Sequence, residues 1–244
     1  MRVVGIVAAV IVWRWVRHEG DGGARQLTPW SVRAEALSLA AMQAGGSIFL
    51  QLERLLAAPA VGLHELATYG VLAAFVSSPF RLLQGAVQFT LIPQLRAASA
   101  ARERRVLVRR EGALVSAPLV IGSAAIWLLA PPLAHWLLAG RYDLGAALVT
   151  VTLFSGWLKL LNGFLTAIVV ACGEERRLGW LSVICWATLG VSGIGAFLGI
   201  PWGLAGVIFG IATGWLARCL LASWLALACL RGAAPLVSLR PSPR

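Results

Sequence analysis

Long apolar runs separated by short polar connections dominate the hydrophobic pattern of the chain. A helix that crosses a bilayer needs about 20 mostly apolar residues. Seven segments are interpreted as spans: 2–16, 35–58, 66–94, 112–139, 143–172, 178–198 and 202–230. The first is short for a full span, and we interpret it as the last part of a helix that begins elsewhere. The segment 178–217 contains no charged residue and is too long for one helix, so the sequence "GIPWG" at 199–203 is predicted to form a turn within it.

The composition agrees with a membrane protein. Of the 244 residues, 59% are hydrophobic and only 13% are charged, whereas about a quarter of a soluble domain is charged. The fold class predicted is therefore all-α: a polytopic membrane helical bundle of about seven transmembrane helices. The net charge of +11 comes mostly from arginines between the apolar runs, where anionic lipid headgroups are the expected neighbours. No basic face with interleaved aromatic residues is present, so nucleic acid is not expected as a partner.

Connections rich and poor in arginine alternate along the chain. The first, third and fifth connections and the tail are basic, the second and sixth contain no Lys or Arg, and in the fourth Arg141 is balanced by Asp143. The positive-inside rule then predicts that the N-terminus lies outside and the C-terminus in the cytoplasm. The predicted organisation is a partial helix at 1–20, a cytoplasmic linker at 21–34, a six-helix transmembrane lobe at 35–230 and a cytoplasmic basic tail at 231–244.

Polar and small residues recur inside four spans at intervals of three or four, which places each group on one helix face. The groups are Gln43, Ser47, Gln51 and Arg54; Arg81, Gln84 and Gln88; Ser155, Lys159, Asn162 and Thr166; and Gly206, Gly210, Gly214 and Arg218. The glycines of the last group are predicted to form a small-residue ridge for close helix packing. Pro79 is predicted to interrupt the third span beside Arg81.

Three cations, Arg81, Lys159 and Arg218, lie near the middle of their spans. Lys159 is about 20 Å from either end of its helix, which is too deep for its side chain to reach the interface. Facing lipid, it would cost at least about 2.5–3.5 kcal/mol. Each cation is therefore expected either to be paired structurally or to face a hydrated cavity, whose surplus positive charge would suit an anionic substrate.

Glu53 is the only acidic residue well inside a predicted span. It can pair with one of the cations or carry a coupling proton, but it cannot neutralise them all. Its neighbour Arg54 is a second candidate for ion coupling or pairing. The alternative is that Arg54, which lies nearer the outer end, extends its side chain to the headgroups.

Motifs for catalysis or cofactor binding are missing from the sequence. The cysteines form no CxxC pair, the histidines are scattered, and no metal site or cofactor is predicted. The two aspartates belong to no paired motif, and no glycine-rich phosphate loop or nucleophile motif occurs. The chain is therefore not expected to be an enzyme.

Several segments resemble a known family. "LATYGVLAAFVSSPFRLLQGAVQFTLIPQLRAA" resembles a helix of the multidrug/oligosaccharidyl-lipid/polysaccharide (MOP) flippases that starts with Tyr-Gly and ends with Pro before a basic loop. "LLAPPLAHWLLAGRYDLGAALVTVTLFSGWLKLLNG" is similar to their turn into the next helix, "ACGEERRLGWLS" to the small polar loop that follows, and "GIPWGLAGVIFGIATGWLAR" to their glycine-rich last core helix. "FLQLERLLAA" falls where an acidic-basic pair often follows a long helix. The resemblance covers about residues 35–230 and fits the polysaccharide and O-antigen branch best.

Such a resemblance implies two six-helix lobes around a cavity whose cations attract the diphosphate of a lipid-linked sugar. The chain would be the second lobe plus one preceding helix, and its partner would be an N-terminal lobe or a second copy. The implied function is a flippase for a lipid-linked oligosaccharide or polysaccharide precursor in the bacterial inner membrane. Arg81, Lys159 and Arg218 would hold the diphosphate, and Gln84, Gln88 and Asn162 would bind sugar or phosphate oxygens. The alternatives are a polytopic enzyme acting on lipid-linked sugars, a lipid II flippase or drug exporter of the same superfamily, and a non-transporting degenerate half.

Overall fold

The computed structural model describes residues 40–41, 43–49, 51–56, 62–98, 100–137, 144–172 and 175–231. The chain divides into two units, Met1–Leu37 and Ser38–Arg244, and every described residue belongs to the second. The predicted partial helix, the linker and all of the tail after Arg231 therefore lie outside the described residues. The described part is helical and contains no strand, which confirms the predicted all-α class.

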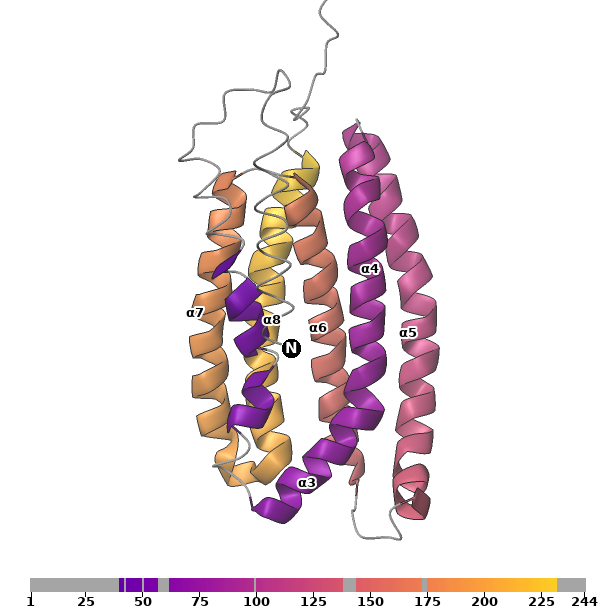
Figure 1. Cartoon of the computed structure of the whole chain (residues 1–244), viewed down its shortest axis with the longest axis vertical. Helices are drawn as coiled ribbons and strands as arrows, with labels where there is room; N and C mark the ends of the chain where they lie inside the picture. The colour runs from indigo at the N-terminus through magenta and orange to yellow at the C-terminus, as the bar shows by residue number, and fades with distance from the viewer. Residues whose placement is uncertain are drawn as a thin grey trace, which may run out of the picture. The chain divides into compact units, whose positions relative to one another are not determined.

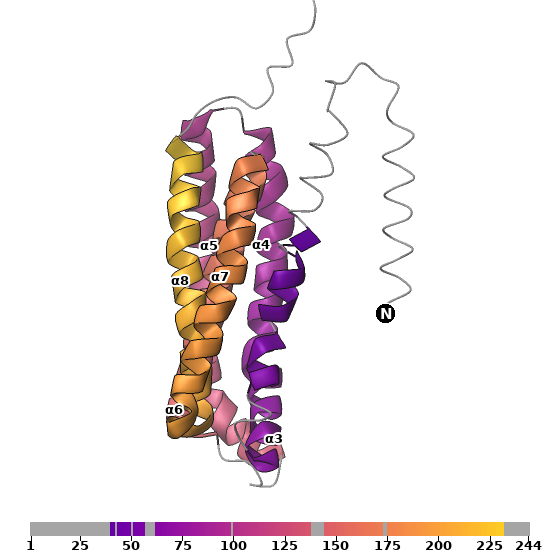
Figure 2. The same cartoon turned by 90° about the vertical axis from the view of Figure 1, so that its left-hand side faces the viewer.

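Six α-helices follow in order, and residues 43–49 and 51–56 are helical as well. The helices are α3 (Leu63–Leu72), α4 (Ser78–Ala97), α5 (Ala101–Leu137), α6 (Ala146–Cys172), α7 (Glu175–Gly199) and α8 (Gly203–Arg231). Helix α6 packs against α8 on one side and α4 on the other, while α7 and α8 run side by side (Figures 1 and 2). The helical bundle is thus organised around α6.

Four stretches of the described chain are long and apolar enough to cross a membrane: Leu66–Ala97, Ala101–Trp136, Ala146–Ala171 and Arg177–Arg231. The last stretch contains both α7 and α8, which are separate helices. The count of seven spans is not confirmed, because 2–16 lies outside the described residues and 35–58 is described only in part. Several long apolar helices remain consistent with a membrane protein.

The connection between α7 and α8 is a tight turn. A short 3-10 segment, Ile200–Trp202, is followed by Gly203, whose φ of 65° lies in the left-handed region. A side chain on an L-residue is strained in this conformation, whereas glycine adopts it freely. The predicted turn in "GIPWG" is therefore confirmed, and it reverses the chain so that α8 returns along α7.

The glycine ridge of α8 packs directly on α7. A Cβ atom added to Gly210 would overlap the backbone carbonyl of Gly195, and one added to Gly206 would overlap that of Gly199. The two backbones approach this closely only because neither helix carries a side chain there. The prediction of a close-packing ridge is confirmed, and its partner is a second set of small residues on α7.

Helices α3 and α4 are inclined to each other (Figure 1). A π-helical turn, Ala73–Ser77, separates them, and Pro79 lies in the first turn of α4. Proline has no N–H to donate to the preceding turn, and π-turns and prolines are common causes of helix kinks. The predicted interruption at Pro79 is confirmed. It places Tyr69 and Arg81 on two helices with different directions.

Two glycines of α6 receive side chains of α4. A Cβ atom on Gly156 would lie 2.8 Å from the Phe80 ring, and one on Gly163 would lie 2.7 Å from Cγ of Gln84. The seven-residue spacing puts both glycines on the same face of α6. The polar face of α4 is thereby held against the polar face of α6.

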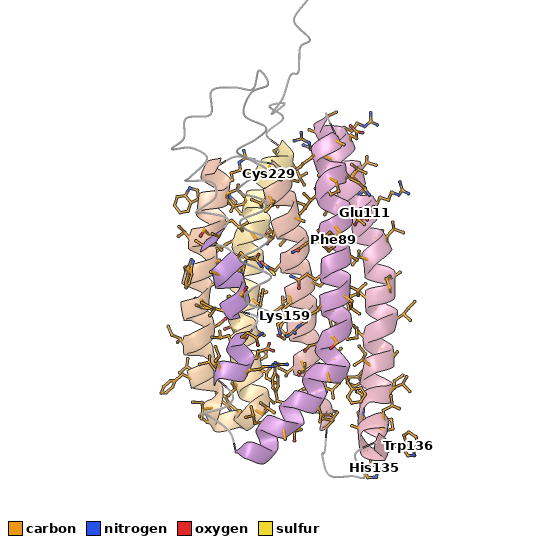
Figure 3. The ribbon with its side chains drawn as sticks, viewed as in Figure 1. Phe89, Glu111, His135, Trp136, Lys159 and Cys229 are labelled. Atoms are coloured by element: carbon orange, nitrogen blue, oxygen red, sulfur yellow. The ribbon has the colours of Figure 1, made fainter. Side chains whose placement is uncertain are left out.

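Basic residues gather at one end of the bundle. Arg105, at the start of α5, donates a hydrogen bond to the carbonyl of Leu230 at the end of α8, at 3.3 Å. Residues 130–137, 144–150 and 195–206, which lie at the opposite end, contain no Lys or Arg. Trp136 and Trp202 are exposed at this opposite end, as in an aromatic belt at a membrane interface (Figure 3 shows Trp136). Which end faces the cytoplasm stays a prediction.

Candidate functional site

A polar cavity of about 320 Å³ lies between the helical residues 43–49 and helices α4, α6 and α8. We call it the polar cavity. Its lining residues are Gln43, Gly46, Ser47, Arg81, Gln84, Gly85, Gln88, Asn162, Gly163, Thr166, Trp215 and Arg218. Five of the six residues predicted from the sequence to bind substrate are among them; the sixth, Lys159, is not. The structure thus brings together polar faces from spans far apart in the sequence.

Helix α4 contributes the exposed Arg81 and the half-buried Gln84 and Gln88. Their spacing of three and four residues places all three on one face, as the sequence predicts. Helix α6 contributes Asn162, which is buried, and Thr166 one turn later. The cavity therefore has an exposed cation at one side and buried hydrogen-bonding groups at the other.

Arg218 is the most deeply buried cation in the lining, with only 3% of its surface exposed. Its guanidinium carbon lies 5.6 Å from the ring centroids of both Phe49 and Trp215, so two aromatic faces hold it by cation–π contacts. Nε and Nη1 have no hydrogen-bond partner within the described part of the chain. A buried guanidinium normally has partners for its N–H groups, because leaving them unpaired is costly.

Three further polar atoms of the lining are buried and have no partner among the described residues: Asn162 Oδ1, Thr166 Oγ1 and Trp215 Nε1. The great majority of buried polar side-chain atoms are hydrogen-bonded to protein or water. Here every such exception in the described chain lines the same cavity as Arg218. This concentration of unused donors and acceptors marks the polar cavity as the candidate site.

Trp215 and Thr166 were not among the predicted site residues, although Thr166 lies on the predicted polar face of α6. Trp215 precedes Arg218 by three residues and so shares its face of α8. That spacing is a signal in the sequence, but an apolar helix rich in tryptophan gives no reason to select one of them.

Lys159 lies near mid-height of the bundle and forms an ion pair with Glu53 (Figure 3). Its Nζ is 2.5 Å from Oε1 of Glu53, and the two side chains are 12% and 3% exposed. The pair joins α6 to the helical residues 51–56. The sequence left open which of Arg81, Lys159 and Arg218 pairs with Glu53, and the structure assigns Lys159. A role of Glu53 in ion coupling stays a prediction.

Two hydroxyl groups complete the surroundings of the Glu53 carboxylate. Tyr69 on α3 donates to Oε2 at 2.7 Å, and Ser155 on α6 donates to Oε1 at 2.9 Å. A buried charge is tolerated when it is both paired and hydrogen-bonded, and this carboxylate has three donors. Arg54, the next residue, is exposed and belongs neither to this network nor to the lining of the polar cavity.

The charge balance of the polar cavity is positive. Arg81 and Arg218 line it, and within the described chain no acidic residue does. Glu53 is already engaged by Lys159 and so does not compensate these two guanidiniums. No group of three or more His, Cys, Asp or Glu side chains in the described residues could hold a metal ion.

A larger cavity of about 690 Å³ lies between α5 and α6. Its lining is mainly leucine, valine and aromatic residues and includes no charged side chain. Its polar groups are partly used within the protein, since Trp157 Nε1 donates to Ser123 Oγ at 2.8 Å. It offers no group that would orient a charged ligand, and the polar cavity therefore remains the candidate site.

Comparisons with models of protein families, with curated proteins and with solved structures found no match to this chain.

Proposed function

We propose that the chain is part of a flippase that moves an anionic lipid-linked oligosaccharide or polysaccharide precursor across the membrane by alternating access. The observation that supports this proposal is the polar cavity, which presents two guanidiniums and several amides in a bundle of apolar helices. Ionisable residues within a membrane span are costly and commonly mark a substrate or ion pathway.

The depth of the cavity supports transport. Arg218 lies 15 residues after Gly203 and 13 before Arg231, which places it about 20 Å from either end of α8. A site at this depth is far from both interfaces, as expected for a carrier that is alternately open to the two sides. A regulatory site for a headgroup would instead lie near one end.

The chemistry of the lining supports an anionic and hydroxylated substrate. Guanidiniums form paired, charge-assisted hydrogen bonds with phosphate oxygens, and side-chain amides can hydrogen-bond both hydroxyl and phosphate groups. The lipid-linked glycan, the bacterial inner membrane and the outside N-terminus are taken from the resemblance to MOP flippases and from the alternating loop charges.

The proposal is tested with the purified chain in liposomes that contain a fluorescent polyprenyl-diphosphate oligosaccharide. A second copy of the chain supplies the other lobe there, and movement of the label by the wild-type chain is the first result required. The fraction of label accessible to an external reductant is followed over time. Arg81→Ala and Arg218→Ala are expected to abolish movement of the label between leaflets. Arg102→Ala is the matched control, because Arg102 is an exposed arginine at the basic end of α5. Movement at the wild-type rate in both cavity variants would refute the proposal.

A further inference from the structure

The Glu53–Lys159 ion pair has a feature that a purely structural pair would not need: its lysine lies one helical turn from Asn162, which lines the polar cavity. Lys159 precedes Asn162 by three residues on α6, so the two side chains leave the helix as neighbours on one face. Asn162 lines the polar cavity, and Lys159 is 12% exposed. A lysine has a flexible four-carbon stem, so its ammonium can exchange one partner for another by a change of rotamer.

Glu53, by contrast, keeps two hydrogen-bond donors when the lysine leaves. Its carboxylate accepts hydrogen bonds from Tyr69 and Ser155 as well as from Lys159. If Lys159 leaves, one donor stays on each carboxylate oxygen. The free energy of releasing the lysine is therefore smaller than for a carboxylate whose only partner is the ammonium.

From this geometry we infer that Lys159 is a ligand-gated switch: in the free protein it pairs with Glu53, and an anionic group in the polar cavity draws it away. The inference rests on the proposed function, because it requires that the polar cavity binds an anion. In the occupied state the ammonium donates to an oxygen of the ligand phosphate, while Glu53 keeps Tyr69 and Ser155. Lys159 thus adds a third cation to Arg81 and Arg218 only when the anion is present.

The exchange would couple occupancy of the cavity to the arrangement of the helices. The ion pair ties α6 to the helical residues 51–56, and Tyr69 extends the same network to α3. Helix α3 meets α4 at the π-helical turn Ala73–Ser77, and α4 carries Arg81 into the cavity. Releasing Lys159 removes one tie between these elements at the moment when the anion is bound.

The switch predicts an effect opposite in sign to that of ordinary structural damage. Glu53→Gln keeps the side chain's shape but abolishes its competition for Lys159, so the affinity for an anion should rise. One additional charge-assisted hydrogen bond corresponds to an increase of about tenfold or more. Tyr69→Phe should lower the affinity for the anion. The Glu53 carboxylate then lacks the hydrogen bond from Tyr69 and so holds Lys159 more strongly.

The test is calorimetric titration of sodium pyrophosphate into the full chain in detergent, at fixed pH and ionic strength. We expect Glu53→Gln to bind about tenfold more tightly than wild type, and the double variant Glu53→Gln/Lys159→Met to lose that gain. Tyr69→Phe should bind about threefold more weakly. Glu111→Gln is the matched control, because Glu111 lies on α5 and does not line the polar cavity. This variant should bind pyrophosphate like wild type.

The outcomes separate this inference from the proposed function. If Arg218→Ala weakens pyrophosphate binding but Glu53→Gln binds with wild-type or lower affinity, the switch is wrong and the cavity site stands. If neither Arg218→Ala nor Arg81→Ala weakens binding, the anion site itself is wrong, and the switch with it. If Glu53→Gln fails to fold, Tyr69→Phe and Ser155→Ala test the switch instead. Both should bind pyrophosphate more weakly than wild type, and unchanged or tighter binding by both would overturn the switch.

Discussion

The stability of the Glu53–Lys159 pair gives the sharpest test of the fold. Replacing Lys159 by methionine leaves a carboxylate that is 3% exposed without its counter-ion. Breaking a buried pair by removing one partner typically costs about 3–5 kcal/mol. Because Tyr69 and Ser155 still donate to Glu53, we expect the lower end, about 3 kcal/mol.

The reciprocal change is expected to cost less. In Glu53→Gln the remaining charge is on Lys159, which is 12% exposed and can extend toward the polar cavity, so a loss of about 1–2 kcal/mol is expected. The double variant carries no charge at these two positions and should lose only about 1 kcal/mol, because neutral replacement of a whole buried pair is often tolerated. The interaction energy of the two sites is then about 3–4 kcal/mol in magnitude, far larger than the departure of about 0.5 kcal/mol seen for independent sites.

The free energy of unfolding is measured by titrating SDS into the protein in mixed micelles, with far-ultraviolet circular dichroism as the signal. The four proteins of the cycle are compared under one set of conditions. If the costs of the two single variants add in the double variant, the two side chains do not interact in the folded protein, and the assignment of this pair is refuted.

Four glycine substitutions test the helix packing by the same unfolding assay. Gly210→Ala should lower the free energy of unfolding by about 2 kcal/mol, because its Cβ atom overlaps a backbone carbonyl of α7. Gly193→Ala is the control: its Cβ atom meets open space, so it should be neutral or stabilise by up to about 1 kcal/mol. Equal effects of the two variants would contradict the α7–α8 contact. Gly203→Ala should cost about 1–3 kcal/mol, because a φ of 65° with a ψ of −156° is a conformation that essentially only glycine adopts, and a neutral result would contradict that turn geometry. Gly163→Ala should change the free energy of unfolding by less than about 1 kcal/mol, because the flexible Gln84 side chain can move aside. The displaced Gln84 should, however, weaken pyrophosphate binding. Unaltered binding would argue against a role for Gln84.

Residue spacing within one helix was readable from the sequence. The intervals in Arg81, Gln84 and Gln88 fix a common face whatever the helix packs against, because an α-helix repeats every 3.6 residues. All three indeed line the polar cavity. The turn before Gly203 and the interruption at Pro79 were equally predictable, since glycine and proline restrict the backbone locally.

Choices between helices were decided only by the tertiary structure. Three cations at similar depth offered Glu53 three partners, and the sequence held no information on which helix lies beside residues 51–56. The structure places α6 there, and so Lys159 pairs with Glu53. Arg218 lies against the Trp215 ring instead and has no carboxylate partner among the described residues. The depth of a residue in its span and the helix face that it occupies follow from the order of residues along one helix. Which helix lies beside that face, and at which height, depends on how several helices pack together.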